Sequence, residues 1–332
     1  MPYSPASVLT STASLQHIQN VVFYERTAVE NLKANLLFVK ATDPKILPRQ
    51  SGKTLRMFTY DLFAANTTPG TEGTVGTGLT PSSQTRDVTI NQYYDFVNFS
   101  DLVVETAIDP IVTNVASELG YRAALTLDAL TSTEFDVAAG VTGTNIDLAN
   151  GQLFTRQEVL RAVMSLQAAD ARPRGDGSFF GIIHPLVAFD LLNDNTAGGV
   201  TDILKYTSEG REELQRGVRN FQVVEIAGVR FHTTTKVPTT ANFPVSGKTG
   251  YHTYVVGQDA VFSVSLDRIP VPNSNQSEKN FRLFINNYRG GSAADPANVI
   301  GASVAYNFKY AAIRRPGNTM TFRRIRSESS IG

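Results

Sequence analysis

The stretch that decides how this chain folds is TLRMFTYDLFAANTTPGTEGTVGTGLTPSSQTRDVTI, residues 54–90. Its two ends alternate apolar and polar residues as paired β-strands do, and the second alternation continues to Phe96. Between them the 25 residues Asp61–Thr85 have no hydrophobic period and carry Gly70, Gly73, Gly76 and Gly78. The pattern predicts an extended hairpin with a long loop at its tip. Because an isolated two-stranded hairpin is marginally stable in water, we expect something outside the chain's own core to cover this ribbon.

Length and composition exclude several classes of protein. A chain of 332 residues exceeds the usual single-core limit of about 250–300, which favours two packed units with extensions. The net charge is zero, so contact with nucleic acid or a membrane would have to be local. Cysteine is absent, which excludes disulfides, thiolate metal sites and cysteine nucleophiles. No apolar run reaches a membrane span and Met1–Pro5 is unlike a secretory signal, so we expect folding in a cytoplasm.

The amino-terminal part predicts a tail followed by one helix. Residues 1–14 are rich in Ser, Thr, Ala and Pro, a composition that needs external packing to become ordered, which a neighbouring subunit would supply. Apolar residues from Ile18 to Leu36 then recur near helical spacing, and Asp43-Pro44 breaks the pattern. No long charged helical leader is visible, so we expect no large cleaved scaffold segment.

A long helix is predicted after the ribbon. Asp109-Pro110 supplies an N-cap residue and a proline at the first helical position. Apolar residues from Ile111 to Leu130 form one stripe at spacings of three and four. A helix reaching about Thr131 would be roughly 35 Å long, enough for a scaffold axis. The polar, turn-rich stretch 142–151 then marks a boundary.

The next unit predicts a mixed α/β domain. Thr155 to Glu158 has the spacing of a capping box and begins a helix. Residues 178–183 predict a buried strand, and His184-Pro185 starts a second helix. Residues 221–226 and 229–235 predict a hairpin around Ala227-Gly228.

The carboxyl end predicts two strands and a local positive charge. Ser303–Tyr310 alternates, Arg315–Asn318 fits a type II turn, and Thr319–Arg326 is expected to return as a strand. Residues 301–332 carry six basic residues against one glutamate, a sum of 6 − 1 = +5. Such arginines either pair with carboxylates of a neighbouring subunit or contact a nucleic-acid backbone, and arginine's enrichment at protein interfaces favours the first. The candidates are Arg314, Arg315, Arg323, Arg324 and Arg326.

Motifs for catalysis or cofactor binding are weak. Ser51–Thr54 and Ser246–Thr249 end like phosphate-binding loops, but Leu47 and Asn242 stand where such a loop needs its first glycine. The four histidines have no metal-ligand spacing, and no Gly-x-Ser-x-Gly elbow is present. We therefore expect ordinary turns and assign no catalytic, cofactor-binding or metal-binding residue.

The order of these parts resembles the major capsid proteins of tailed bacteriophages, whose fold is shared with herpesviruses. The resemblance covers nearly the whole chain. It is carried by Gln92-Tyr93, Phe96-Val97, Ser100-Asp101, Asp109, Gly120, Asp128, Phe180–Pro185, Val224–Val229, Lys236–Pro238 and Ala305–Arg314.

The resemblance implies an α+β capsid fold with five parts. These are an amino-terminal arm with a helix (1–49), an extended β-hairpin loop (50–99), a peripheral domain with a long spine helix (100–150), an α/β axial domain (151–270) and a return to the peripheral domain with the carboxyl-terminal strands (271–332). In the family the extended loop lies over an adjacent subunit. Gly70, Gly73, Gly76 and Gly78 at its tip are therefore expected to make intersubunit contacts.

The function so implied is structural. Hexamers and pentamers of this chain would form an icosahedral head, assembled in the host cytoplasm, that encloses double-stranded DNA without sequence specificity. The chain would have no cofactor, no catalytic turnover and no membrane contact, and its partners would be itself, a portal, and scaffold or decoration proteins. Two alternatives stay open: a bacterial encapsulating compartment of the same fold that holds protein cargo, and a soluble phosphate-handling α/β enzyme.

Overall fold

A computed structural model describes residues 36–48, 50–61, 63–70, 72–73, 78–100, 111–137, 145–175, 177–194, 222–266, 281–286, 301–317 and 321–331. The amino-terminal tail and the predicted helix as far as residue 35 lie outside these residues. So do the predicted helix start at Asp109-Pro110, the tip residue Gly76, and Asn318 of the predicted type II turn.

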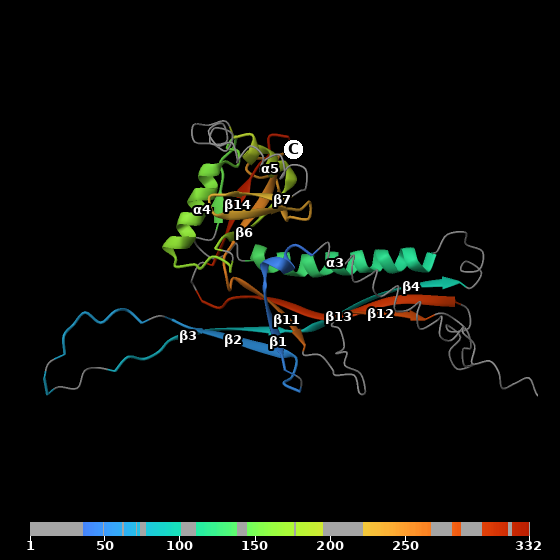
Figure 1. Cartoon of the computed structure of the whole chain (residues 1–332), viewed down its shortest axis with the longest axis horizontal. Helices are drawn as coiled ribbons and strands as arrows, with labels where there is room; N and C mark the ends of the chain where they lie inside the picture. The colour runs from blue at the N-terminus through green and yellow to red at the C-terminus, as the bar shows by residue number, and fades with distance from the viewer. Residues whose placement is uncertain are drawn as a thin grey trace, which may run out of the picture.

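A long helix, α3 (Ile111–Val137), is the axis of the molecule and separates an α/β unit from a sheet (Figure 1). It runs for 27 residues, about 40 Å, and so extends six residues beyond the predicted end at Thr131. Ala116, Leu119 and Ala123 recur at three- and four-residue spacing and are buried against the sheet. Small side chains at two of these positions let the helix lie close to the strands.

The sheet on one side of α3 has five strands. Its order is β1 (Asp43–Leu47), β11 (Val261–Leu266), β13 (Gly301–Arg314) and β12 (Phe281–Asn286), and β4 (Asn91–Ser100) also pairs with β13. The alternation predicted in β13 is confirmed. Its side chains from alternate positions pack on α3, namely Val304, Tyr306, Phe308 and Tyr310.

One part of the ribbon prediction is wrong. The segment ending in Phe96 was expected to continue the hairpin, but β4 pairs residue by residue with β13, from Asn91 opposite Tyr310 to Ser100 opposite Gly301. Tyr93 and Val97 of β4 pack against the α3 core, whereas Tyr94 and Phe96 are exposed. The apolar alternation of this strand therefore serves the chain's own sheet, and the extended loop is shorter than residues 50–99.

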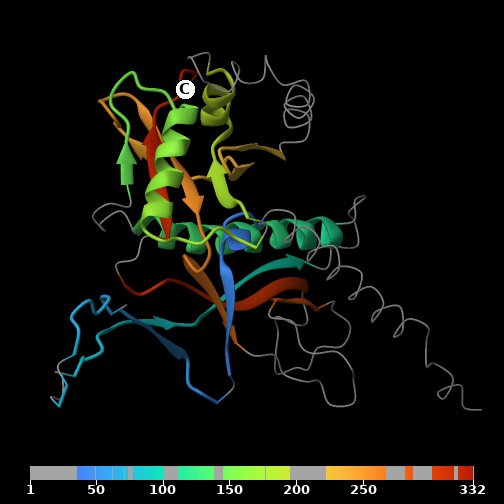
Figure 2. The same ribbon diagram turned by 60° about the vertical axis from the view of Figure 1, so that its left-hand side comes forward.

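The α/β unit on the other side of α3 contains a seven-stranded sheet in the order β5-β14-β10-β6-β8-β7, with β9 paired to β10 (Figure 2). The predicted helix–strand–helix–hairpin succession is confirmed. Thr155 stands at the N-cap of α4, but its side chain makes no capping hydrogen bond. The elements are β5 (Asn145–Asp147), α4 (Arg156–Ala168), β6 (Phe179–Ile183), α5 (Pro185–Leu192), β7 (Gln222–Ile226), β8 (Val229–Thr233), β9 (Thr239–Ala241), β10 (Thr249–Val256) and β14 (Phe322–Ser327).

The last strand corrects the expected domain assignment of residues 271–332. We expected it to return to the peripheral domain that contains the long helix, but β14 pairs antiparallel with β10 and parallel with β5 inside the α/β unit. Ile325 is fully buried in the core of that unit. Gly317 has φ 104°, a conformation that suits glycine, and it lies where the chain leaves β13 for the other unit. Two strands adjacent in sequence thus belong to different sheets.

A buried carboxylate attaches the residues before β1 to the long helix. Asp128 of α3 accepts hydrogen bonds from the backbone N–H groups of Leu37, at 3.1 Å, and Val39, at 3.5 Å, beside the short helix η2 (Val39–Ala41). Burial raises the pKa of Asp128 to about 6, while the hydrogen bonds from the backbone amides and the charge of Lys40 act in the opposite direction. Tyr310 of β13 lies close enough for the Asp128 charge to raise its pKa further, although burial is the main cause of that rise.

The raised pKa predicts how Asp128 affects stability. The folded pKa is above the unfolded value of about 3.9, so the folded protein binds more protons between these values and gains stability as the pH falls from about 7 to about 5. The gain from this group is on the order of 1 kcal/mol. Urea unfolding at both pH values should show it in the wild type and not in Asp128→Asn. An identical pH dependence in the two proteins would contradict this assignment.

Candidate functional site

The ribbon predicted from residues 54–90 projects from the body as a separate two-stranded sheet (Figures 1 and 2). Strand β2 (Thr54–Tyr60) pairs antiparallel with β3 (Ser83–Thr89), from Thr54 opposite Thr89 to Tyr60 opposite Ser83. The backbone N–H of Asp61 donates to the carbonyl of Ser82 and continues the pairing by one step. The hairpin prediction is confirmed for this stretch.

The base of the ribbon is attached to the chain's own body. Leu55, Met57 and Val88 pack against a buried cluster formed by Leu47, Ile90, Phe262, Val264, Ala311 and Ile313. On β3, Arg86 forms an ion pair with Glu134 of α3 at 3.6 Å. These contacts orient the ribbon at its root.

Beyond that base, the ribbon is uncovered. Every residue that the structure describes from Tyr60 to Thr85 is exposed, including Gly70, Gly73 and Gly78. Four large apolar side chains are among the exposed residues of the ribbon, Phe58 at 61%, Tyr60 at 63%, Phe63 at 56% and Leu79 at 71%. A two-stranded hairpin with several exposed large apolar side chains is typical of a surface that binds a partner.

An arginine–aspartate pair joins the two strands of the exposed ribbon. Arg56 Nε and Nη2 donate to the two carboxylate oxygens of Asp87 at 2.8 and 2.7 Å. The hydrogen bond from Arg56 holds the pKa of Asp87 below its ordinary value, and the same bond raises the pKa of Arg56. Solvent surrounds this pair, so it fixes the register of the strands more than it adds stability.

The carboxyl-terminal arginines do not form one surface. Arg324, whose side chain is 5% exposed, donates to Asp136 at the end of α3. Arg326 forms a two-pronged pair with Asp147 of β5, and Arg323 Nε donates to Ser165 of α4 at 2.7 Å. The intersubunit expectation is wrong for Arg324, because its charge is buried against a carboxylate of its own chain.

Sequence reasoning missed the network around Asp136. His252 Nδ1 lies 2.9 Å from Asp136 Oδ1, and the Tyr254 hydroxyl donates to the same oxygen at 3.4 Å. The hydrogen bond with His252, followed by that with Arg324, lowers the pKa of Asp136 to about 2. The three partners come from β10 and β14, more than a hundred residues away from Asp136, and no local motif marks them.

Arg314 and Arg315 lie at the point where the chain leaves β13. Both side chains are half-buried. Burial lowers the pKa of Arg314, and the nearby charge of Arg86 lowers it further. These two residues and Arg323 remain candidates for contact with a neighbouring subunit or with nucleic acid.

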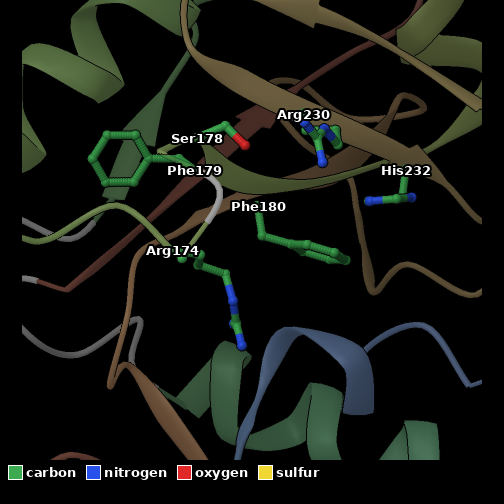
Figure 3. Close-up of a pocket in the computed structure, with 7 residues that line it drawn as sticks. Arg174, Ser178, Phe179, Phe180, Arg230 and His232 are labelled. Carbon is green, nitrogen blue, oxygen red and sulfur yellow. The ribbon is translucent and has the colours of Figure 1, made fainter.

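A hollow of about 320 Å³ in the α/β unit is the place to test the enzyme alternative (Figure 3). Its cations do not converge on a substrate position. Arg174 extends away from Arg230 and donates to the carbonyl of Ala41 at 2.7 Å and to Asp43 at 2.9 Å. His232 stacks on Phe180 with ring centroids 4.4 Å apart. The lining residues are Arg174, Gly175, Ser178, Phe179, Phe180, Arg230 and His232.

The two phosphate-loop look-alikes are turns that lead into strands. Residues 51–53 precede β2 and residues 246–248 precede β10, and neither opens a helix whose amides could hold a phosphate. Lys248 is also paired with Glu328 at 2.5 Å. In the described part of the chain no group of three His, Asp or Glu residues could hold a metal ion. Likewise, none of its described helices is long and apolar enough to cross a bilayer.

These turns support a simple prediction about nucleotides. The wild type should bind nucleotide no more strongly than background, and Lys53→Ala and Lys248→Ala should bind it equally weakly. The reason is that neither lysine stands in a loop that wraps a phosphate. Isothermal titration with ATP and magnesium would measure it. A wild-type affinity that either substitution abolished would favour the phosphate-handling alternative.

Comparison with known proteins shows similarity in structure. No family model and no curated protein sequence matches the chain. The capsid of cyanophage P-SCSP1u is 15% identical with a TM-score of 0.62, covering 89% of both chains. The capsid of Ralstonia phage GP4 is 12% identical with a TM-score of 0.64, covering 87% of both, and the mature capsid of bacteriophage PhiM1 is 13% identical with a TM-score of 0.57, covering 87% and 86%. The chain therefore has the tailed-phage capsid fold.

Proposed function

We propose that this chain is a major capsid protein, which self-assembles into hexamers and pentamers of an icosahedral phage head. The observation that carries the proposal is the uncovered ribbon on a capsid fold: described residues from Tyr60 to Thr85 have no cover from their own chain. In a closed shell, a neighbouring copy of the chain is available to cover the ribbon of every subunit.

The ribbon suits contacts that repeat around a rotation axis. Head-to-tail contacts of this kind close into rings when the rotation closes, and each copy then both gives and receives a ribbon. The half-buried root, with Leu55 and Met57 packed on the chain's own core, would set the direction of the ribbon. The glycines at its tip, Gly70, Gly73, Gly76 and Gly78, would let the tip adapt to hexamers and pentamers.

The remaining parts of the proposal follow from a shell role. The head would enclose double-stranded DNA without sequence specificity, through local charges such as Arg314, Arg315 and Arg323, because the net charge of the chain is zero. Portal, scaffold and decoration proteins would be its other partners, the virion its location, and the host cytoplasm the place of assembly. The chain would act without catalytic turnover or a cofactor.

A bacterial compartment of the same fold with protein cargo is the second candidate, although none of the observations favours it over a phage head. The two functions differ in what the particle contains. Purified particles treated with nuclease should retain a protected double-stranded DNA of genome length if the chain forms a phage head. Protected protein cargo without DNA would favour the compartment.

The first test of self-assembly is the size of the purified protein. Size-exclusion chromatography and electron microscopy should show capsomers or megadalton shells. An enzyme would instead form a small, defined oligomer. A stable monomer with residues 61–85 protected from proteolysis would contradict the proposal, because the ribbon would then be covered without a partner.

A further inference from the structure

Residues 37–43, which we name the strap, connect three parts of the molecule at the point where the chain enters β1. Figures 1 and 2 both show this segment crossing α3 on its way to β1 in the five-stranded sheet. At its first residue the strap is attached to α3, since Leu37 donates its backbone N–H to Asp128. At its last residue it enters the sheet, since Asp43 pairs in parallel with Phe262 of β11.

Arg174 of the α/β unit holds the carboxyl-terminal half of the strap. Arg174, which follows α4, donates to the carbonyls of Ala41 and Thr42 at 2.7 and 3.4 Å and to Asp43 at 2.9 Å. The other Asp43 oxygen accepts the backbone N–H of Asp259 at 2.8 Å, in the turn between β10 and β11. A guanidinium that binds two carbonyls and a carboxylate holds backbone and side chain together, which a lysine could not reproduce.

The aromatic side chain of Phe38 in the strap forms a wedge that contacts both α3 and the α/β unit. Phe38 is fully buried, with its ring centroid 6.0 Å from Phe135 of α3 and 5.9 Å from Tyr254 of β10. Phe135 in turn packs edge-on against Phe322 of β14 at 5.5 Å. Next to this cluster, Asp136 of α3 accepts hydrogen bonds from Tyr254 and Arg324. Movement of Phe38 would therefore disturb the same contacts that join α3 to the α/β unit.

We propose that the strap is a conformational coupling element: the position of the chain entering at residue 37 sets the orientation of the α/β unit against α3. The strap is the shared partner of Asp128 on the helix and Arg174 on the α/β unit, and its wedge lies between them. Close-packed aromatic contacts transmit a displacement because they leave no room to absorb it. The coupling acts within one chain and does not depend on the proposed assembly function.

The test uses Arg174, whose side-chain hydrogen bonds to residues 41–43 hold the strap. Arg174→Met removes the hydrogen bonds to residues 41–43, and hydrogen–deuterium exchange followed by mass spectrometry reads the effect in the full-length chain. We expect exchange to rise about tenfold or more in residues 37–43, as for the loss of charged hydrogen bonds. We also expect a rise in residues 132–137 of α3. Arg174 also lies over the ring of Phe180, 6.0 Å from its centroid, and methionine keeps an apolar side chain at that position.

Two further variants complete the experiment. Arg122→Met removes an arginine–aspartate pair between α3 and β4, Arg122 with Asp95 at 2.7 Å, and should leave residues 37–43 and 132–137 at the wild-type rate. Arg174→Lys keeps the positive charge but loses the forked guanidinium, so hydrogen exchange should rise less in both segments than in Arg174→Met. This variant replaces Arg174→Met in the experiment if Arg174→Met does not fold. Faster exchange confined to residues 37–43, or no change in them, would overturn the proposal.

Discussion

Deleting Ala64–Ser82 is expected to abolish closed particles while leaving the body of the protein folded. The deletion joins Phe63 to Ser83 and leaves a short connection of the length that hairpins use. Described residues in the deleted stretch are all exposed, so the unfolding free energy of the unassembled chain should change by less than about 0.5 kcal/mol. A neighbouring copy would lose the surface that covers it. Electron microscopy and denaturant unfolding measure the two effects separately.

A substitution of side chains alone makes the same test without changing the length of the ribbon. Phe58→Ser with Tyr60→Ser removes two exposed aromatic rings that lie 5.6 Å apart and have no place in the chain's own core. If a second copy covers them, assembly should weaken by about 1.5–3 kcal/mol for each ring that becomes fully buried. The concentration needed for assembly reports this change. Normal shells from both the deletion and the double substitution would refute an intersubunit role for the ribbon.

Arg324→Met is expected to destabilise the unassembled chain by about 3 kcal/mol. The substitution leaves Asp136 without its main cation beside the buried His252 and Tyr254. We expect the lower end of the range for breaking a buried pair, because the Asp136 side chain is 38% exposed. Urea unfolding would measure it. The same substitution should loosen the attachment of the α/β unit to α3, since Asp136 lies on the helix.

The pH dependence and a matched control define this prediction further. The pKa of Asp136 is lowered to about 2, so its stabilising contribution is present above the ordinary value of about 3.9 and is lost as the pH falls toward about 2. The part of the difference between wild type and variant that comes from Asp136 should therefore stay constant from about pH 8 to about pH 5. Arg326→Met on the same strand removes a pair whose aspartate is 43% exposed and should cost about 1 kcal/mol or less. Equal losses of unfolding free energy from Arg324→Met and Arg326→Met would show that the burial of Arg324 does not determine how much its ion pair stabilises the protein.

Local sequence patterns predicted the helices and strands of this fold well where a single local feature, such as the hydrophobic period or a capping residue, determines the element. The stripe of apolar residues predicted α3, and the alternation in Ser303–Tyr310 predicted the inner face of β13. His184-Pro185 predicted the start of α5, where the His184 side chain accepts the backbone N–H of Leu186. The ribbon followed from the same reasoning, because its alternation ends in a loop with nothing to bury. Each of these features depends on neighbours within a few residues.

Long-range pairing is where sequence reasoning was wrong. Alternation shows that β4 has two different faces, but it does not say which strand lies beside it, and β13 is some two hundred residues away. Likewise, the strand after the turn at Gly317 was expected to return to the peripheral domain, whereas β14 pairs with β10 in the α/β unit. The sequence also left open which carboxylates pair with Arg324 and Arg326. A row of arginines in a sequence looks the same whether the carboxylates that pair with it lie in the same chain or in another.

The amino-acid sequence by itself determined the kinds of element, their order, and the presence of a ribbon that cannot bury its own tip, since these depend on periodicity and turn chemistry. Only the tertiary structure decided which strands share a sheet, which arginines are buried, and that the strap of residues 37–43 joins α3 to the α/β unit. The physical reason is that pairing and burial are set by contacts between residues distant in sequence, and these leave no local pattern.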